Sequence, residues 1–369
     1  MPQFVRSTWL PISRWANANK LEQLRSVHRE YVCVMRETLD VLWLRPVVGP
    51  RPRYTEIGIK THLSSNLVRN ATCDAAAIVV GTRRSAKRLK RPAAKPVIKD
   101  DHPMQLGEEF VKITASDEAK HFDAWIRFAA LYKRGHDAER RAVSVPVNFN
   151  RHVTKLRNKG ELRQYVIFDG HRVGLVFRCE AKPREAGAMI GIDVGIADVV
   201  TASDGQHGRQ HSHGWSLSQI QQRLARRRKG SRGFRRAQDL RTNFINWSVN
   251  QLNLDNVSTL VVEDIKHLRR GRPCDRFQSH WTYAKILNKL NMLAEEHGVR
   301  VIKVNPAYTS QKCSNCGKID RDSRKAKHFR CTQCGFECDA DMNAATNLRF
   351  VGEALAVPRV GENERQELS

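Results

Sequence analysis

Four cysteines near the carboxyl end of the chain have the spacing of a metal site. Cys313 and Cys316 form one CxxC pair, and Cys331 and Cys334 form a second, with 14 residues between the pairs and a glycine after each. A CxxC pair places two thiolates on one tight turn, and two such turns close a tetrahedral sulfur shell around an ion. We therefore predict that these residues hold one structural Zn²⁺, which stabilises a segment too short to have a core of its own.

The other cysteines do not share this spacing. Cys338 closely follows the second pair, and we expect it to be a bystander. A redox role for the CxxC pairs would need the strand and helix context of a thioredoxin-like site, which the flanking sequence lacks. The scattered residues Cys33, Cys73, Cys179 and Cys274 are expected to be reduced, buried thiols.

Three carboxylates far apart in the sequence end or begin predicted elements. Asp193 ends the apolar run 189–193, Glu263 ends the apolar run 258–263, and Asp341 starts a helical pattern. A single acid in such a place is often only a turn residue or a helix cap. Three of them can converge at one end of a sheet and hold two divalent ions about 4 Å apart, one to activate water and one to stabilise the leaving oxygen of a phosphodiester. Hard oxygen ligands beside a phosphate favour Mg²⁺, or Mn²⁺ in vitro.

Two neighbouring acids are not expected to join this set. Asp264 directly follows Glu263 in the sequence. Asp339 lies two residues before Asp341, so a helical start turns it away from the same face.

The charge of the chain indicates a polyanionic partner. It has 64 Lys and Arg against 38 Asp and Glu, a formal net charge of +26. Such an excess repels itself in a folded protein, and nucleic acid is the partner best suited to neutralise it. The alternatives are a basic chain that is merely soluble and helix faces that are merely solvated. We predict phosphate contacts from two clusters, which comprise Arg83, Arg84, Lys87 and Arg88, and Arg223, Arg226, Arg227, Arg228, Lys229 and Arg232.

The pattern of apolar residues changes along the chain. After a short strand at residues 4–10, amphipathic spacing predicts helices over about 21–35 and 55–90. Short alternating runs between residues 96 and 185 predict a small β-barrel or sheet, with a hairpin turn at Asp169-Gly170.

From residue 188 onward, strands alternate with helices, which predicts an α/β layer structure. A long polar helix over about 216–253 should be interrupted near Gly230 and Gly233. The tail from about residue 351 is expected to be poorly ordered. The predicted strands are 189–193, 197–203, 258–263 and 299–304, and a further amphipathic helix spans 281–297.

Nothing in the sequence indicates a membrane. It contains no apolar run of about 18 residues or more. Its first residues lack the apolar segment of a signal peptide, so we expect a cytosolic protein.

Four motifs occur in a fixed order in the second half of the chain. They are Gly191-Ile192-Asp193-Val194-Gly195, Val262-Glu263-Asp264-Ile265, the run from Asn305 to Cys313, and the run from Asp341 to Asn347. Together they resemble the signature of TnpB, the RNA-guided nuclease carried by certain insertion sequences, which compact type V CRISPR effectors share. The resemblance covers roughly residues 186–350, and the first half of the chain matches only in the order of its elements.

The resemblance implies a multidomain α+β fold in two lobes. One lobe would be a wedge-like β-barrel domain split by a helical recognition domain. The other would be a RuvC nuclease domain, with an RNase H-like α/β fold, split by a zinc ribbon that binds the target nucleic acid. The implied bounds are 1–12 and 95–185 for the wedge, 13–94 for the recognition domain, 186–308 and 336–351 for the nuclease, 309–335 for the ribbon, and 352–369 for a disordered tail.

The resemblance also implies an activity, namely cleavage of DNA by an RNA-guided, Mg²⁺-dependent endonuclease of the TnpB type. By position, Asp193, Glu263 and Asp341 match the family's catalytic acids, and the four paired cysteines match its zinc ligands. The implied partners are a guide RNA and a target DNA, which the protein would read beside a short motif. A monomer is favoured, although a small CRISPR effector would allow a dimer.

Other functions stay open at this point. The sequence does not separate a transposon-encoded TnpB from a compact type V CRISPR effector. A non-cleaving RNA-guided regulator is less favoured because the three acids are intact. A guide-independent RuvC nuclease, such as a junction resolvase, is less favoured because of the ribbon and the long basic first half.

Overall fold

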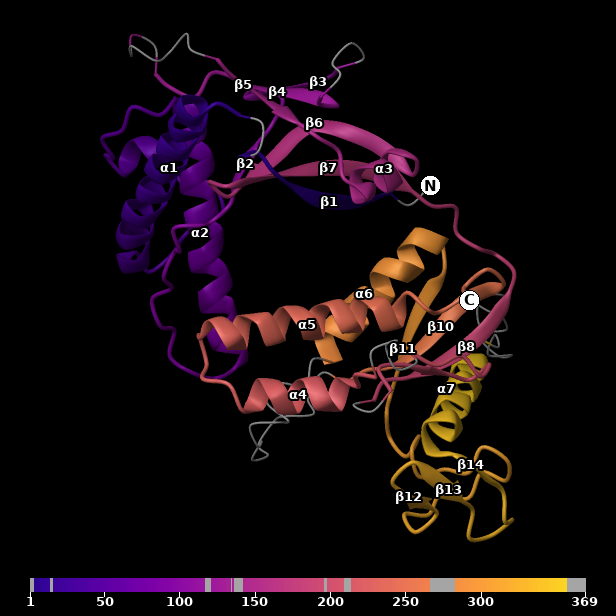
Figure 1. The fold of residues 1–369 in the computed structure, drawn as a ribbon. Coiled ribbons are helices and arrows are strands. Elements are labelled where there is room, and N and C mark those ends of the chain that lie inside the picture. The colour runs from indigo at the N-terminus through magenta and orange to yellow at the C-terminus, as the bar shows by residue number, and fades with distance from the viewer. Residues whose placement is uncertain are drawn as a thin grey trace, which may run out of the picture. The chain divides into compact units, whose positions relative to one another are not determined.

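The structure, a computed structural model, describes residues 3–13, 16–116, 121–133, 135, 142–195, 198–208, 214–265 and 283–356. The chain divides into two compact units, Gln3–Glu180 and the unit that begins at Ala181. Each unit has a hydrophobic core of its own and mixes helices with strands (Figure 1). Among the described residues, no helix is long and apolar enough to cross a membrane.

Two long helices pack together in the first unit (Figure 1). Helix α1 (Ala18–Leu44) begins where the Asn17 side chain accepts the N–H of Asn19, and it confirms the predicted amphipathic helix. Helix α2 (Ser65–Arg88) begins about ten residues later than the apolar spacing predicts. The reason is tertiary: Leu63 forms a β-bridge with Tyr132, so the helix cannot begin before that residue, and only η1 (Tyr54–Glu56) is helical ahead of it.

Antiparallel strands form two sheets in the same unit. One has the order β1 (Gln3–Pro11), β7 (Arg172–Glu180), β6 (Gly160–Phe168), β2 (Met104–Leu106). The other contains β3 (Val111–Ala115), β4 (Ala124–Phe128) and β5 (Val143–Val147), and the short helix α3 (Arg151–Arg157) precedes β6. The predicted hairpin is confirmed, since the Asp169 carboxylate accepts the N–H groups of His171 and Arg172 at 3.0 and 2.7 Å.

The second unit is built on a four-stranded sheet of order β11-β10-β8-β9. Strands β8 (Ala188–Asp193), β10 (Val257–Glu263) and β11 (Arg300–Val304) are parallel, and the short β9 (Thr201–Ala202) is antiparallel to β8. Helices α4 (Leu217–Ala225), α5 (Arg232–Val249) and α6 (Tyr283–His297) share one core with the sheet, and α7 (Ala340–Ala356) packs on a second set of strand residues. This is the alternation of strands and helices that the sequence predicts.

Three local predictions need correction. The helical stretch 216–253 is interrupted between Ala225 and Arg232, as Gly230 predicts, but Gly233 lies inside α5. Cys33 is exposed rather than buried, while Cys274 lies outside the described residues. Helix α7 extends past residue 351 to Ala356 because Gly352 allows it to lie close against Val261 of the sheet.

A small three-stranded sheet lies between β11 and α7 in the sequence. It consists of β12 (Arg324–Lys325), β13 (His328–Arg330) and β14 (Glu337–Asp339), with β13 in the middle. Strand β14 ends at Asp339 and α7 begins at the next residue. The position of the small sheet is therefore coupled directly to the start of α7.

The contact between β8 and α7 leaves no room for a side chain at Gly191. A Cβ atom there would lie 1.9 Å from the backbone carbonyl oxygen of Ala345. We expect Gly191→Ala to lower the free energy of unfolding by about 1–3 kcal/mol or more, because the helix must move off the sheet. Urea denaturation of the full chain measures this loss. The control is Gly233→Ala in the first turn of α5, where a Cβ meets only the Arg227 side chain at 3.5 Å, and an equal loss there would contradict the packing argument.

Candidate metal sites

Two parallel strands turn Asp193 and Glu263 toward the same face of the sheet. The residues end β8 and β10, which are adjacent and in register. Side chains two apart on a strand share a face. Gly191 lies against α7, and Val261 belongs to the core beneath α7, so Asp193 and Glu263 lie on the α7 side.

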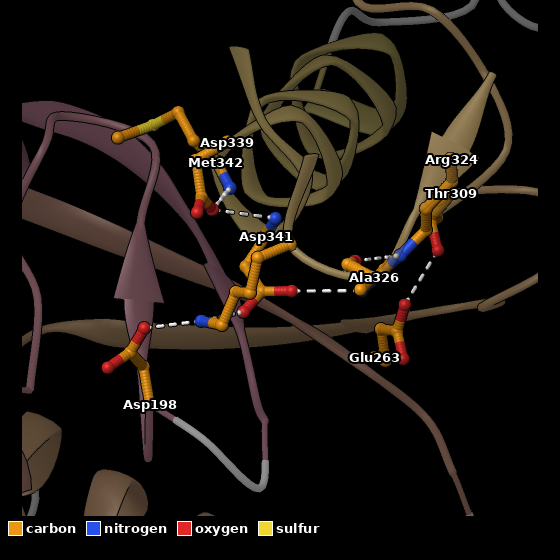
Figure 2. Close-up of polar contacts among 9 residues, drawn as sticks. Asp198, Glu263, Thr309, Arg324, Ala326, Asp339, Asp341 and Met342 are labelled. Atoms are coloured by element: carbon orange, nitrogen blue, oxygen red, sulfur yellow. Dashed lines mark hydrogen bonds and ion pairs between the residues drawn. The ribbon is translucent and has the colours of Figure 1, made fainter. Parts of the chain in front are cut away.

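Helix α7 brings Asp341 to the same edge. Asp341 lies in the first turn of the helix, is 6% exposed, and sits four residues before Ala345, which contacts β8. The carboxylate of Asp339 accepts the N–H groups of Asp341 and Met342 at 2.9 and 3.1 Å, so it caps the helix and faces away from the set (Figure 2). The Asp341 carboxylate thus lies at the amino terminus of the helix, where the backbone carries a partial positive charge.

Burial and mutual repulsion act on this group of carboxyls. Burial, followed by the charges of Asp341 and Glu263, raises the pKa of Asp193 to about 7. Burial also raises the pKa of Glu263 above its usual value, although the hydroxyl of Thr309 opposes this by donating to Oε1 at 2.6 Å. Burial and neighbouring negative charge both disfavour the ionised carboxylate, and a bound proton or a nearby cation relieves this cost.

The loop after β11 is fixed by two amides of α7. The Asn347 side chain donates to the backbone oxygens of Thr309 and Lys312 at 3.0 and 2.7 Å. The Asn343 side chain donates to Lys312 at 2.8 Å and accepts the N–H of Ser314 at 2.9 Å. These bonds hold Thr309 where its hydroxyl reaches Glu263.

Two cations of the β12–β13 hairpin contact Asp341, and Figure 2 labels one of them, Arg324. Arg324 donates from Nη2 to Oδ1 at 3.0 Å, and Lys327 donates from Nζ to Oδ2 at 2.7 Å. The Lys327 ammonium also donates to the carboxylate of Asp198, which lies in the turn after β8. These cations supply part of the compensation that the carboxyls require.

The four paired cysteines form a compact sulfur cluster. Their Sγ atoms all lie within 4.8 Å of one another, with 3.8 Å between Cys313 and Cys334 and 3.6 Å between Cys316 and Cys331. A tetrahedral zinc site with Zn–S bonds of about 2.3 Å places its sulfurs about 3.8 Å apart. Backbone N–H donation, chiefly from Phe336, lowers the pKa of Cys334 to about 6, which favours the thiolate that binds metal. The cluster therefore fits Zn²⁺, and Cys338 lies outside it.

Among the described residues, no other group of His, Cys, Asp or Glu, the three carboxylates included, has its ligand atoms within this spacing. The carboxyls of Glu263 and Asp341 are near enough to Asp193 for their charges to raise its pKa. The oxygens of the three residues are nevertheless too far apart to form one compact ligand cluster.

Parts of the chain are similar in sequence to known proteins. Residues 283–348 match the family model of the Cas12f1-like TNB domain. The chain is 44% identical over 91 residues to the CRISPR-associated endodeoxyribonuclease Cas12f1 of Sulfoacidibacillus thermotolerans, a match that covers 24% of this chain and 21% of that protein. It is 34% identical over 119 residues to a TnpB-like protein of Aquifex aeolicus, covering 28% of this chain and 39% of that protein. Over these segments the chain is similar to Cas12f1 and to a TnpB-like protein.

The whole fold has a solved counterpart as well. A structure of Cas12f1 with its single-guide RNA and target DNA superposes with a TM-score of 0.56 at 14% identity, covering 94% of this chain and 99% of the other. This likeness supports the mixed α/β fold. The sequence matches to Cas12f1 and TnpB are shorter, since they span about a fifth and two fifths of those relatives.

The residues predicted to contact nucleic acid fall into two kinds: one is hydrogen-bonded within the fold, and the others are exposed. Arg83 donates to the backbone oxygens of Trp43, Arg45 and Pro46 at 2.8 to 3.2 Å, so its guanidinium closes the end of α1. The remaining nine are exposed, on α2, on α4, in the α4–α5 connection and at the start of α5. They are Arg84, Lys87, Arg88, Arg223, Arg226, Arg227, Arg228, Lys229 and Arg232.

Sequence reasoning missed the residues that act on the carboxylates. Lys327, Arg324 and Asp198 were not singled out from the sequence. Thr309, Asn343 and Asn347 lie within the motif runs but were given no contact role. The one available signal was proximity in sequence, since Asp198 is five residues past Asp193.

The cysteine cluster predicts which thiols hold zinc. The purified protein should contain one Zn²⁺ per chain, and Cys316→Ser should lose it because three thiolates leave the shell open. Elemental analysis by mass spectrometry measures the ratio. Cys338→Ser is the matched control, and zinc loss in that variant equal to the loss in Cys316→Ser would contradict the four-ligand assignment.

The raised pKa of Asp193 predicts a dependence of stability on pH. The pKa of this carboxyl rises from its ordinary value of 3.8 to about 7 on folding. The free energy of unfolding therefore falls as the pH rises from about 4 to about 7, and the full loss is reached above pH 7. With zinc retained and no Mg²⁺ added, Asp193→Asn should stabilise the protein by about 1–3 kcal/mol at pH 8 and by less at pH 5. Thermal unfolding at both pH values tests this. Asp255→Asn, at the exposed opposite end of β10, should show no such trend.

Proposed function

We propose that this protein is an RNA-guided DNA endonuclease of the TnpB type. The observation that carries the proposal is the convergence of Asp193, Glu263 and Asp341 at one edge of a parallel sheet. This convergence occurs in a chain related to Cas12f1 and TnpB. The three acids come from two strands and a helix far apart in sequence, so their meeting is a property of the fold.

In this proposal the three carboxylates are the catalytic acids and hold two Mg²⁺ ions. Their oxygens are the hard ligands that Mg²⁺ prefers, and their mutual repulsion favours the binding of a cation. When bound, Mg²⁺ supplies an activated water and charge stabilisation of the phosphodiester. The strands fix Asp193 and Glu263, the Thr309 hydroxyl orients Glu263, and Arg324 places a guanidinium beside the acids where a phosphate would bind.

The domain boundaries belong to the same proposal. We assign the RuvC nuclease domain to residues 186–308 and 336–351, and the zinc ribbon to residues 309–335. The wedge domain, a split β-barrel, takes residues 1–12 and 95–185 around a helical recognition domain at 13–94. The division of the chain at Ala181 and the antiparallel sheets of the first unit are consistent with these bounds.

The exposed cations are proposed to bind the guide RNA and the target DNA. The net charge of +26 supports this, as does the structure of Cas12f1 with both nucleic acids. Around the end of α4, Arg223, Arg226 and Arg227 line a surface hollow of about 490 Å³ together with Trp215. The Arg223 guanidinium lies 5.5 Å from the centre of the Trp215 ring, a pairing of cation and aromatic that suits phosphate and base contacts.

A compact type V CRISPR effector is the second candidate, and the 44% match to Cas12f1 favours it. Sequencing the RNA that co-purifies with the protein separates the two. A scaffold encoded beside transposon ends supports TnpB, and a repeat-derived scaffold supports the CRISPR effector.

The nuclease proposal is tested with the protein bound to its co-purified RNA. Asp193→Ala, Glu263→Ala and Asp341→Ala should each slow cleavage of matched DNA in Mg²⁺ by roughly a thousandfold, because each removes an ion ligand. RNA binding should persist in all three. The control Asp255→Asn should cut normally. Full-rate cutting by Asp193→Ala would reject the assignment, and tight target binding by the wild type without nicking would favour a regulator.

A further inference from the structure

The ammonium of Lys327 lies between two carboxylates that come from different elements. It is 2.7 Å from Oδ2 of Asp341 and also contacts Asp198. The Asp341 side chain is 8% exposed, whereas the side chains of Asp198 and Lys327 are 34% and 41% exposed. The Lys327 side chain therefore extends from the exposed edge of the group of carboxyls to the buried Asp341 carboxylate.

Both oxygens of Asp341 are already engaged by cations. Arg324 takes Oδ1 and Lys327 takes Oδ2. A divalent ion that binds Asp341 must displace at least one of these donors or share an oxygen with it. The guanidinium of Arg324 is rigid and also donates to the carbonyl of Ala326 at 3.3 Å. Lys327 has a flexible stem and a second carboxylate to receive it, so it is the donor that can move at the smaller cost.

We propose that Lys327 is exchanged for a divalent cation at Asp341, and that Asp198 holds the displaced ammonium beside the site. The inference rests on the proposed function in that Asp341 is taken as an ion ligand. Lys327 and Asp198 are then positioning residues: one neutralises Asp341 in exchange with the ion, and the other keeps the positive charge at the site edge. There the ammonium can contact a phosphate of the bound strand.

The first experiment measures ion affinity with Mn²⁺ as the probe, on the full chain with its zinc retained. Lys327→Met removes the competing ammonium, and Mn²⁺ should bind about threefold to tenfold more tightly. Lys325→Met is the matched control, because it removes the same charge from an exposed position of the same hairpin. Calorimetry or Mn²⁺ resonance titration gives the two dissociation constants. Equal affinity in the two variants, or weaker binding in Lys327→Met, overturns the exchange.

Asp193→Ala separates this inference from the proposed function. If this variant binds Mn²⁺ as tightly as the wild type does, the ions lie elsewhere, and the function and the inference both fall. If Asp193→Ala loses Mn²⁺ binding while Lys327→Met binds Mn²⁺ no more tightly than Lys325→Met, the ion site is supported and only the exchange is rejected.

The second experiment tests the role of Asp198 through the midpoint of thermal unfolding. Asp198→Asn and Lys327→Met each remove one partner of the same contact, so the double variant should lose less than the two single losses together. Because the displaced ammonium rests on Asp198, this coupling should persist in saturating Mn²⁺. The pair Asp198→Asn and Lys325→Met should be additive. Additive losses for Asp198→Asn and Lys327→Met in Mn²⁺ would overturn the role of Asp198.

Discussion

The second unit places three carboxyls at one edge of an apolar sheet, and the cost of burying their charges is the constraint to which the surrounding residues respond. Isolated buried charges are costly, and like charges at close range add to that cost. Each surrounding feature offsets part of it: the amino terminus of α7 favours Asp341, the hydroxyl of Thr309 donates to Glu263, and Arg324 and Lys327 bring positive charge. The raised pKa of Asp193 shows that the compensation is incomplete. In the proposed function, bound divalent ions would supply the positive charge that the surrounding side chains provide only in part.

Helix α7 connects the group of carboxyls to the segment that carries the four paired cysteines. It follows β14 without a connecting loop, and its close approach to β8 at Gly191 fixes Asp341 relative to Asp193. The ribbon has a very small core, in which Phe329 packs with Ala340 of α7, so its shape depends on the sulfur cluster. The hairpin that carries Arg324 and Lys327 belongs to this ribbon. The sulfur cluster thereby stabilises the hairpin that places these two cations beside the acids.

The features with a strong local signal were predictable from the sequence, and those that depend on long-range contacts were not. Apolar runs gave β8 and β10 with their terminal acids, and the CxxC spacing gave the sulfur cluster, because each is encoded within a few residues. The late start of α2 depends on Leu63 pairing with Tyr132, 69 residues away in the numbering, and no periodicity reports such a pairing. The contact of Lys327 with Asp198 joins residues still farther apart, at a separation of 129. The proposed catalytic roles rest on the order of the motifs together with this convergence.

The positive charges of the chain differ in what they are able to do, and composition does not reveal the difference. Arg83 is bound to three backbone carbonyls, so most of its hydrogen-bonding capacity is used within the fold. Arg324 and Lys327 are bound to acids, and they become available to a phosphate only as another cation takes over the acids. Exposed residues such as Arg226 and Arg228 need no such exchange. In the proposed function, nucleic acid would therefore bind the exposed clusters first by charge alone, whereas binding of a phosphate at the acids would be conditional on a divalent ion. Such an order would make affinity for the strand and readiness to cut it separate properties of one basic protein.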